Sequence, residues 1–198
     1  MEHKIIEAAK ATFLKKGYKD TNMADIAAEV GLTRPAMHYY FRTKERLFQA
    51  VFGDILMSFI PQIKESLCAN IPLELKVSQI VETYMSVLED SPMLPVFIVQ
   101  EINRDIDNII SIALDNNLVE LGQSVVNVLN CEMEEGRIRK MPLIELGYTF
   151  YGLMMVPFLA RPAGQMIFGK DSYSPEFLQE WKENVIRQMV YLLKPQNE

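Results

Sequence analysis

The sequence is poor in cysteine and glycine and has no long apolar run, and each shortage excludes a class of protein. Its two cysteines, Cys68 and Cys131, have a separation that fits neither a disulfide framework nor a zinc site. Each lies in an apolar helical stretch, so we predict buried, free thiols in a reducing cytoplasm. The longest apolar run, residues 147–160, contains Pro157 and is shorter than the ~20 residues that a membrane span needs. With nine glycines and no signal-peptide pattern at residue 1, we expect an ordered protein outside any membrane.

The side chains that carry most enzyme chemistry are scarce as well. Both histidines, His3 and His38, fall in the first fifty residues, and there is no Gly-rich phosphate loop, metal-ligand spacing or Ser/His/Asp order. The paired carboxylates at 134–135 and at 105 and 107 lie at expected helix ends, where solvation is the simpler interpretation. We therefore predict no enzyme activity, no metal and no cofactor.

Charge is unevenly distributed along the chain. The formal net charge is −6, which by itself argues against a nucleic-acid partner. Residues 1–50 nevertheless hold nine Lys/Arg and six Asp/Glu, a net charge of +3, so the remaining residues carry −9. A basic head on an acidic body is the distribution expected where one end of a protein meets phosphate.

The stretch from residue 21 to residue 44 reads as two short helices joined by a tight turn. In the first fifty residues we predict helices over 2–16, 22–30 and 34–40. The residues expected to end or cap them are Gly17, Thr21, Gly31 and Thr33. Gly31 can take the left-handed backbone that a sharp turn requires, and Pro35 is tolerated in a first helical turn. This pattern describes a helix-turn-helix, whose second helix enters the DNA major groove, although an ordinary helical hairpin would share it.

The helix predicted over 34–40 is the candidate DNA-reading element. Met37 and Phe41 have the spacing to face the core, which turns the residues between them outward. The outward set comprises Arg34, Ala36, His38 and Tyr39. A cation, a small residue, an imidazole and a phenol on one face suit contacts with base edges and phosphates.

The first fifty residues resemble the DNA-binding domain of the TetR family of transcriptional regulators. The residues that match in order and spacing are Ile6, Ala9, Phe13, Gly17, Tyr18, Thr21, Ile26, Ala27, Gly31, Leu32, Thr33, Met37, Tyr40, Phe41, Lys44, Glu45, Leu47 and Phe48. The resemblance implies base or backbone contacts by Thr33, Arg34, Ala36, His38 and Tyr39, and phosphate contacts by Tyr40, Thr21 and Lys44. Many members have Gly where this chain has Pro35, which implies a changed backbone contact at that position.

Beyond the head the pattern is helical throughout. We predict helices over 44–68, with a bend at Pro61, and over 72–89, 91–104, 105–135, 142–160 and 174–193, with a loop over 162–172. The predicted fold is therefore all-α. It comprises a three-helix helix-turn-helix DNA-binding domain over residues 1–46 and a helical ligand-binding and dimerisation domain over residues 47–198.

The last two predicted helices are apolar on more than one face. One buried stripe is enough for a helix in a small domain, so a second stripe indicates a partner, most simply a second copy related by a two-fold axis. The residues proposed for this interface are Phe150, Met154, Phe158, Trp181, Val185 and Met189. The alternative is that both helices are buried in a larger monomeric core.

The second domain is also a candidate ligand-binding body. Its many methionines fill gaps in a core or line an adaptable apolar pocket, and a few polar groups interrupt them. The pocket candidates are Tyr84, Met85, Phe97, Arg104, Tyr148, Tyr151 and Met155. The TetR resemblance implies a small-molecule effector in such a pocket, without identifying it.

These expectations combine into one function. The chain is predicted to be a cytoplasmic homodimer that binds a near-palindromic double-stranded operator and acts as a ligand-responsive repressor, since repression by steric block is the usual TetR mode. The alternative is a helical protein-interaction module without DNA binding, which would not explain the cations and aromatics around the turn. The sequence identifies neither the operator nor the regulated genes.

Overall fold

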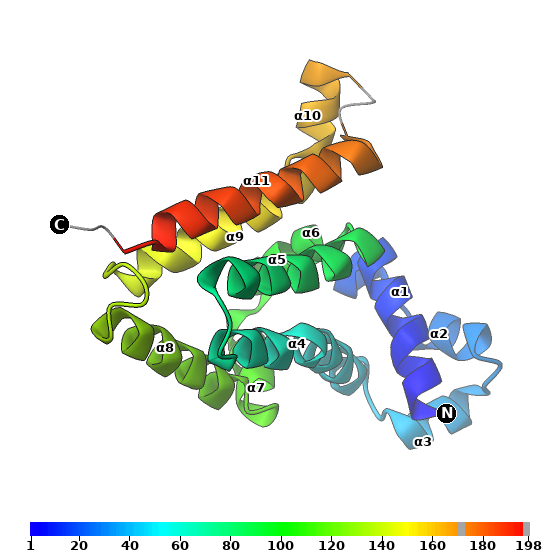
Figure 1. Cartoon of the computed structure of the whole chain (residues 1–198). Helices are drawn as coiled ribbons and strands as arrows, with labels where there is room; N and C mark the ends of the chain where they lie inside the picture. Colours follow the sequence, from blue (N-terminus) through cyan, green and yellow to red (C-terminus); the bar gives the residue numbers. More distant parts are fainter. Residues whose placement is uncertain (170–172, 196–198) are drawn as a thin grey trace. The chain divides into compact units, whose positions relative to one another are not determined.

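The computed structural model describes residues 1–169 and 173–195, and within them every regular element is an α-helix. The helices are α1 Glu2–Asp20, α2 Met23–Glu29, α3 Arg34–Tyr40, α4 Lys44–Cys68, α5 Leu73–Asp90, α6 Leu94–Arg104, α7 Ile106–Asp115, α8 Leu118–Glu134, α9 Leu143–Leu159, α10 Arg161–Phe168 and α11 Pro175–Leu193 (Figure 1). The all-α prediction is confirmed.

The predicted bounds of α3 and α4 agree with the structure to the residue. Helix α1 extends past its predicted end, but Gly17 has φ 76° and breaks the helical geometry inside it. The expected stop at Gly17 is therefore present as a kink, and one further turn follows it. Pro61 lies inside α4, which continues to Cys68.

Two stretches were predicted wrongly. The single helix expected over 105–135 is two helices, because Asn117 has φ 55° and separates α7 from α8. Asparagine tolerates this left-handed conformation better than most residues, so a break here is physically reasonable. Most of the expected loop over 162–172 is helix α10, in which Pro162 occupies the first turn, and residues 170–172 lie outside the described residues.

The chain divides into two compact units. Unit 1 comprises residues 1–58 and 96–118, and unit 2 comprises residues 59–95 and 119–198. Helix α4 contributes to both units, and helices α6 and α7 belong almost wholly to unit 1. The boundary between these units differs from the predicted domain boundary between residues 46 and 47. That boundary concerns where the DNA-binding module ends, and it remains a prediction.

Unit 1 is built around an aromatic core. Phe48, fully buried, contacts Phe13 of α1 at a centroid distance of 5.6 Å and Phe97 of α6 at 5.9 Å. Ile5, Ile26 and Met37, on α1, α2 and α3, are also fully buried. Ring contacts thus join α1 to α4 and α4 to α6, and α2 packs against α1 and α3.

Unit 2 is a helical layer in which α5 packs against α9 and α11. The buried residues of these three helices are Val77, Val81, Tyr84, Met85, Leu88, Leu146, Met154, Phe158, Val185, Met189, Val190 and Leu193. The N–H of Arg139 donates to the carbonyl of Leu193 at 2.8 Å, which ties the segment before α9 to the end of α11.

Both cysteines are exposed, so the prediction of buried thiols was wrong; they are free, as expected. Among the described residues, no single helix is long and apolar enough to cross a membrane. Helices α9 and α10 meet that criterion only as a pair, across a bend of 64°.

Candidate nucleic-acid interface

The turn between α2 and α3 is set by a glycine. Gly31 has φ 70°, and the N–H of Leu32 donates to the carbonyl of Ala27 at 2.8 Å while the N–H of Gly31 donates to that of Ala28 at 3.2 Å. This pair of hydrogen bonds, with a left-handed glycine, is the Schellman ending of a helix. Helix α2 therefore stops abruptly, as the sequence predicted, and the chain turns at once into α3.

Helix α3 is anchored by buried side chains on its inner face and is capped at its first turn. Met37 is fully buried and Phe41 nearly so, which fixes the inner face as predicted. The Thr33 hydroxyl accepts a long hydrogen bond of 3.4 Å from the N–H of Ala36. Thr33 thus caps the helix and is exposed beside Arg34, at the end of α3 where positive backbone dipole favours an anion.

The outer face of α3 presents aromatic and basic groups to solvent. Tyr39 is 85% exposed, and its ring meets that of Tyr40 edge-on at a centroid distance of 5.4 Å. His38 is exposed, and its Nδ1 lies 3.2 Å from the carbonyl oxygen of Arg42. A donor role for Nδ1 in this bond leaves Nε2 as an acceptor when the ring is neutral. Ala36 is half-buried between these groups.

Thr21 does not occupy the position predicted for a phosphate contact. Its side chain is 3% exposed, and its hydroxyl donates to the carbonyl of Gly17 at 2.7 Å. The cap of α2 is the next residue, Asn22, whose side-chain oxygen accepts from the N–H of Ala24 at 3.0 Å. Asn22 is exposed and belongs to the residue types that cap helices, so the same signal that selected Thr21 was present one position later.

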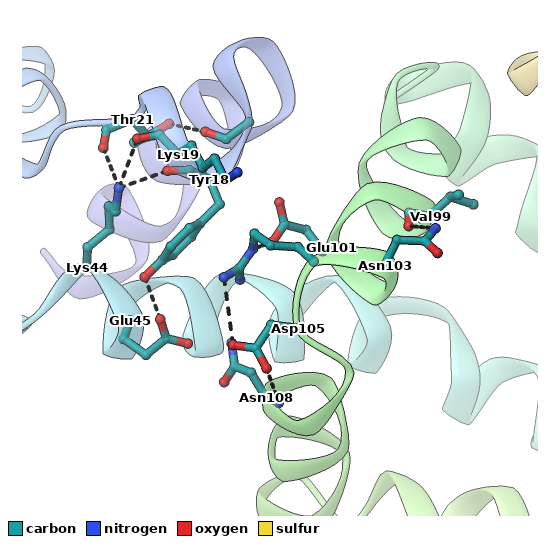
Figure 2. A network of polar contacts seen from close by, with 12 residues as sticks. Tyr18, Lys19, Thr21, Lys44, Glu45, Val99, Glu101, Asn103, Asp105 and Asn108 are labelled. Carbon is teal, nitrogen blue, oxygen red and sulfur yellow. Dashed lines mark hydrogen bonds and ion pairs between the residues drawn. The ribbon is translucent and has the colours of Figure 1, made fainter.

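Lys44, a predicted phosphate contact, makes hydrogen bonds within the chain. Figure 2 shows its ammonium directed at the end of α1, where it donates to the carbonyls of Tyr18 at 2.9 Å, Thr21 at 3.0 Å and Lys19 at 3.2 Å. An ammonium has three donors, and all three are used here. Lys44 therefore satisfies carbonyls that the end of a helix leaves unpaired, and it joins the start of α4 to the head.

The ring of Tyr18 connects this cap to α6. The Lys44 ammonium lies 4.5 Å from the ring centroid, the Arg104 guanidinium carbon lies 4.1 Å from it, and the hydroxyl donates to Glu45. Burial together with the Glu45 carboxylate raises the pKa of Tyr18 to about 12. Arg104 pairs in turn with the buried carboxylate of Glu101. The head is thus joined to α4 and α6 by charged groups as well as by apolar packing.

The seven predicted pocket residues separate into two groups. Phe97 is buried in the aromatic core of unit 1, and Arg104 belongs to the Tyr18 network. The other five belong to unit 2: Tyr84, Met85, Tyr148, Tyr151 and Met155. Among these, the buried Tyr84 hydroxyl lies 3.0 Å from that of Tyr151, whereas Tyr148 faces solvent.

Two hollows lie within unit 2, and neither is lined by a predicted pocket residue. One, of about 490 Å³, lies beside Lys76, Glu132 and Arg137. Glu132 accepts from Arg137 at 2.9 Å and lies 3.5 Å from Lys76, and Arg137 also pairs with Glu135, so two carboxylates balance two cations. The other hollow, of about 590 Å³, has apolar walls contributed by α9, α10 and α11.

The six predicted interface residues differ in burial within the single chain. Met154, Phe158, Val185 and Met189 are buried inside a single chain. These four side chains contribute to the core of unit 2, and their part in an interface remains a prediction. Phe150 and Trp181 remain half-buried, and the Trp181 Nε1–H donates to the carbonyl of Leu153 at 2.9 Å.

A Schellman-terminated helix, a glycine turn and a second helix with an exposed polar face define a helix-turn-helix DNA-binding protein. Residues 5–51 match the bacterial regulatory proteins of the tetR family. Residues 5–51 therefore form a DNA-binding domain of the tetR family, as the resemblance of the first fifty residues predicted.

Individual relatives agree with this assignment. The chain is 24% identical over 165 residues to a fatty acid metabolism regulator protein of Bacillus subtilis, covering 83% of this chain and 76% of the relative. It is 43% identical over 51 residues to the HTH-type transcriptional regulator TtgR of Pseudomonas putida, covering 26% of this chain and 24% of the relative. A TetR family transcription regulator from Marinobacter aquaeolei shares the fold, with a TM-score of 0.72 and 15% identity over 98% of this chain and 96% of that one.

Proposed function

We propose that this protein is a ligand-responsive repressor that binds a near-palindromic operator as a homodimer and works in the cytoplasm. The observation that carries the proposal is the exposed face of α3. Arg34, His38 and Tyr39 point away from a core that Met37 anchors. Side chains of these types read base edges and hold phosphates when their helix lies in the major groove.

The DNA-contact set is proposed in a revised form. Thr33, Arg34, Ala36, His38 and Tyr39 contact the operator, and Tyr40 contacts a phosphate at the edge of the groove. Thr21 and Lys44 support the head from inside, because their polar groups are bonded within the chain. Arg42 joins the set as a phosphate contact, since it is exposed directly after α3, and sequence reasoning passed over it.

The family and the surface of α9 support the proposed homodimer. Regulators of this family typically act as dimers, and two recognition helices about 34 Å apart match one turn of DNA. The exposed residues of α9 are largely apolar and include Ile144, Tyr151 and Val156. Beside them lie the half-buried Phe150 of α9 and Trp181 of α11, the two predicted interface residues that remain available.

The proposed effector is a mainly apolar molecule with one hydrogen-bonding group. The Tyr84–Tyr151 hydroxyl pair lies among the rings of Phe59 and Phe150, with centroid distances to Tyr84 of 4.9 and 5.1 Å. A ligand that separates these packed rings would meet apolar surface and one pair of hydroxyls. Because one relative is named a fatty acid metabolism regulator, fatty acids and their thioesters are the first compounds to test.

The proposal is tested by a mobility-shift titration with duplexes drawn from the region upstream of the gene. We expect one duplex to be retarded at low protein concentration, with loss of affinity as salt rises. Equal weak binding to every duplex would contradict a sequence-specific repressor. Candidate effectors are then added to the specific complex, and release by one of them supports ligand response. Failure of all DNA to bind at low salt would favour the protein-interaction alternative.

A further inference from the structure

Helix α10 is an apolar projection whose last residues, as far as the described part of the chain shows, are largely exposed. None of its eight residues is buried, and Met166, Ile167 and Phe168 are 81%, 66% and 78% exposed. Figure 1 shows α10 standing away from the paired helices α9 and α11. A helix this short is not stable in water by propensity alone and depends on tertiary contacts. The exposed apolar side chains at the end of α10 therefore indicate a surface that binds another molecule.

An apolar hollow lies at the base of this projection. Val156 of α9, Phe168 of α10 and Phe177 and Trp181 of α11 contribute to its walls, and its volume is about 590 Å³. Small residues also line it, among them Gly152, where an added Cβ would meet nothing within 4 Å. The hollow is open to side chains that enter from outside the chain. Met166 and Ile167 are not among its lining residues.

The surface around the hollow suits a second copy of this chain. Two chains of net charge −6 repel each other unless they meet through an uncharged face. Helix α9 carries one charged residue, Glu145, among seventeen, and Val156 and Tyr151 are exposed on it. A two-fold axis brings the same patch of both chains together, so one patch must hold both a projection and a hollow. This patch holds both, and it continues the proposed dimer face.

We propose that Met166 and Ile167 of each subunit dock into the apolar hollow between α9, α10 and α11 of the second subunit. Helix α10 then acts as an arm that each subunit extends across the dimer. This inference rests on the proposed homodimer and specifies how its subunits hold each other. Because an apolar side chain that leaves water contributes to association, removing both arms is expected to weaken the dimer at least a hundredfold.

The test compares variants of the full chain by sedimentation equilibrium. The arm variant is Met166→Ser with Ile167→Ser, and its control is Leu75→Ser with Val119→Ser, two apolar residues exposed elsewhere in unit 2. The hollow variant is Gly152→Leu, and its control is Gly122→Leu, because residue 122 lies on α8, outside the proposed dimer face, and an added Cβ there is equally free. We expect the arm and hollow variants to raise the dimer dissociation constant at least a hundredfold. Both controls should remain within threefold, with circular dichroism confirming helical content.

Mixing the two variants separates docking between subunits from packing within one. The arm variant keeps an intact hollow, and the hollow variant keeps an intact arm, so a mixed dimer contains one complete pair. An equimolar mixture should therefore form dimers at a concentration where each variant alone is monomeric. No recovery in the mixture would show that α10 acts within its own chain and would overturn the proposal.

Other outcomes are equally decisive. A dimeric wild type with unchanged dissociation constants in both variants would overturn arm docking while leaving the homodimer intact. A wild type that is monomeric even with its operator would overturn the homodimer itself. Binding of the wild type, but not the arm variant, to phosphatidylglycerol vesicles, with equal dimer constants, would assign the arm to a membrane surface instead.

Discussion

The guanidinium carbon of Arg104 lies 4.1 Å from the centroid of the Tyr18 ring, so the end of α6 is tied to the end of α1. The same arginine pairs with Glu101, whose carboxylate is buried at 3% exposure. Arg104 therefore contributes to stability through a cation–π contact with Tyr18 and through an ion pair with Glu101. A cation over an aromatic ring contributes about 0.5–2 kcal/mol, whereas a buried charge that loses its partner costs about 3–5 kcal/mol. The cost of leaving Glu101 unpaired is the larger of the two, so a substitution of Arg104 should have a measurable effect on stability.

Arg104→Met is expected to lower the free energy of unfolding by about 3 kcal/mol, chiefly because Glu101 is left unpaired. Glu101→Gln combined with Arg104→Met removes the stranded charge and should recover at least about half of that loss. Urea unfolding of the wild type, both single variants and the double variant measures the coupling. A double variant no more stable than Arg104→Met would show that the Tyr18 contact dominates. Arg46→Met, at an exposed position, controls for loss of a cation.

Lys44→Ala is expected to reduce stability more than it changes phosphate contact. Three carbonyl oxygens at the end of α1 lose a charged donor, which costs about 1.5–3 kcal/mol. Arg42→Ala, at the exposed position after α3, should instead leave the melting temperature unchanged and lower the salt slope of operator binding by about one. Thermal melts and mobility shifts at four salt concentrations distinguish the two residues. A lower salt slope for Lys44→Ala at unchanged stability would restore its predicted phosphate role.

Local signals in the sequence predicted the head almost completely. The bounds of α3, the glycine turn and the inner face of Met37 and Phe41 all depend on neighbouring residues. The hydrogen bonds of Thr21 and Lys44 are not visible in this local pattern. The Thr21 hydroxyl bonds to the carbonyl of Gly17 in the preceding turn, and Lys44 bonds to carbonyls at the end of another helix. Sequence spacing indicates that a polar side chain is present, but not whether it already forms a hydrogen bond within the chain.

The break between α7 and α8 shows a second limit. The apolar pattern runs on through it, yet Asn116 packs against Gly53 of α4 so closely that an added Cβ would lie 2.8 Å from the amide of Asn116. This contact joins residues distant in the chain, and no local pattern reveals it. The consecutive asparagines at 116 and 117 were a usable turn signal. Conversely, Pro162 and Gly164 suggested a loop where helix α10 forms.

Tyr39→Ala is expected to remove specific operator binding without changing stability. Its ring is 85% exposed, so little packing is lost with it. Tyr191→Ala is a matched control, because Tyr191 of α11 is 83% exposed and lies outside the proposed interface with DNA. Titration of the operator and of an unrelated duplex should show at least a tenfold loss for Tyr39→Ala on the operator alone. Equal affinity of both variants for the operator would remove Tyr39 from the contact set.

Two glycine substitutions should have opposite effects on stability. Gly31→Ala places a side chain at φ 70°, with no steric neighbour within 4 Å, so the cost is backbone strain of about 1 kcal/mol. Gly147→Ala lies within α9, also in open space, and should stabilise by about 0.5–1 kcal/mol because alanine favours helix. Chemical unfolding measures both. A neutral Gly31→Ala would indicate that the turn has an alternative conformation.

Glu132 should make unit 2 sensitive to acid. A hydrogen bond from Arg137, together with the charge of Lys76, lowers the pKa of Glu132 below its ordinary value of 4.5. Since the folded state holds this proton less tightly than the unfolded state, the contribution to stability is present above pH 4.5 and is lost as pH falls through the lower folded value. Glu132→Gln should therefore be less stable than the wild type at pH 7, and its melting temperature should fall less between pH 5 and pH 3.

The matched control for this prediction is Glu134→Gln. Glu134 lies on the same helix, α8, and is exposed, so its replacement changes net charge equally without removing the Arg137 and Lys76 contacts. Melting curves at half-unit intervals of pH give the difference between each variant and the wild type. If the two variants show the same pH dependence, the acid response comes from net charge, and the Glu132 network contributes nothing specific to it. A difference confined to Glu132→Gln, closing as the pH falls through its folded pKa, would locate the response in that carboxylate.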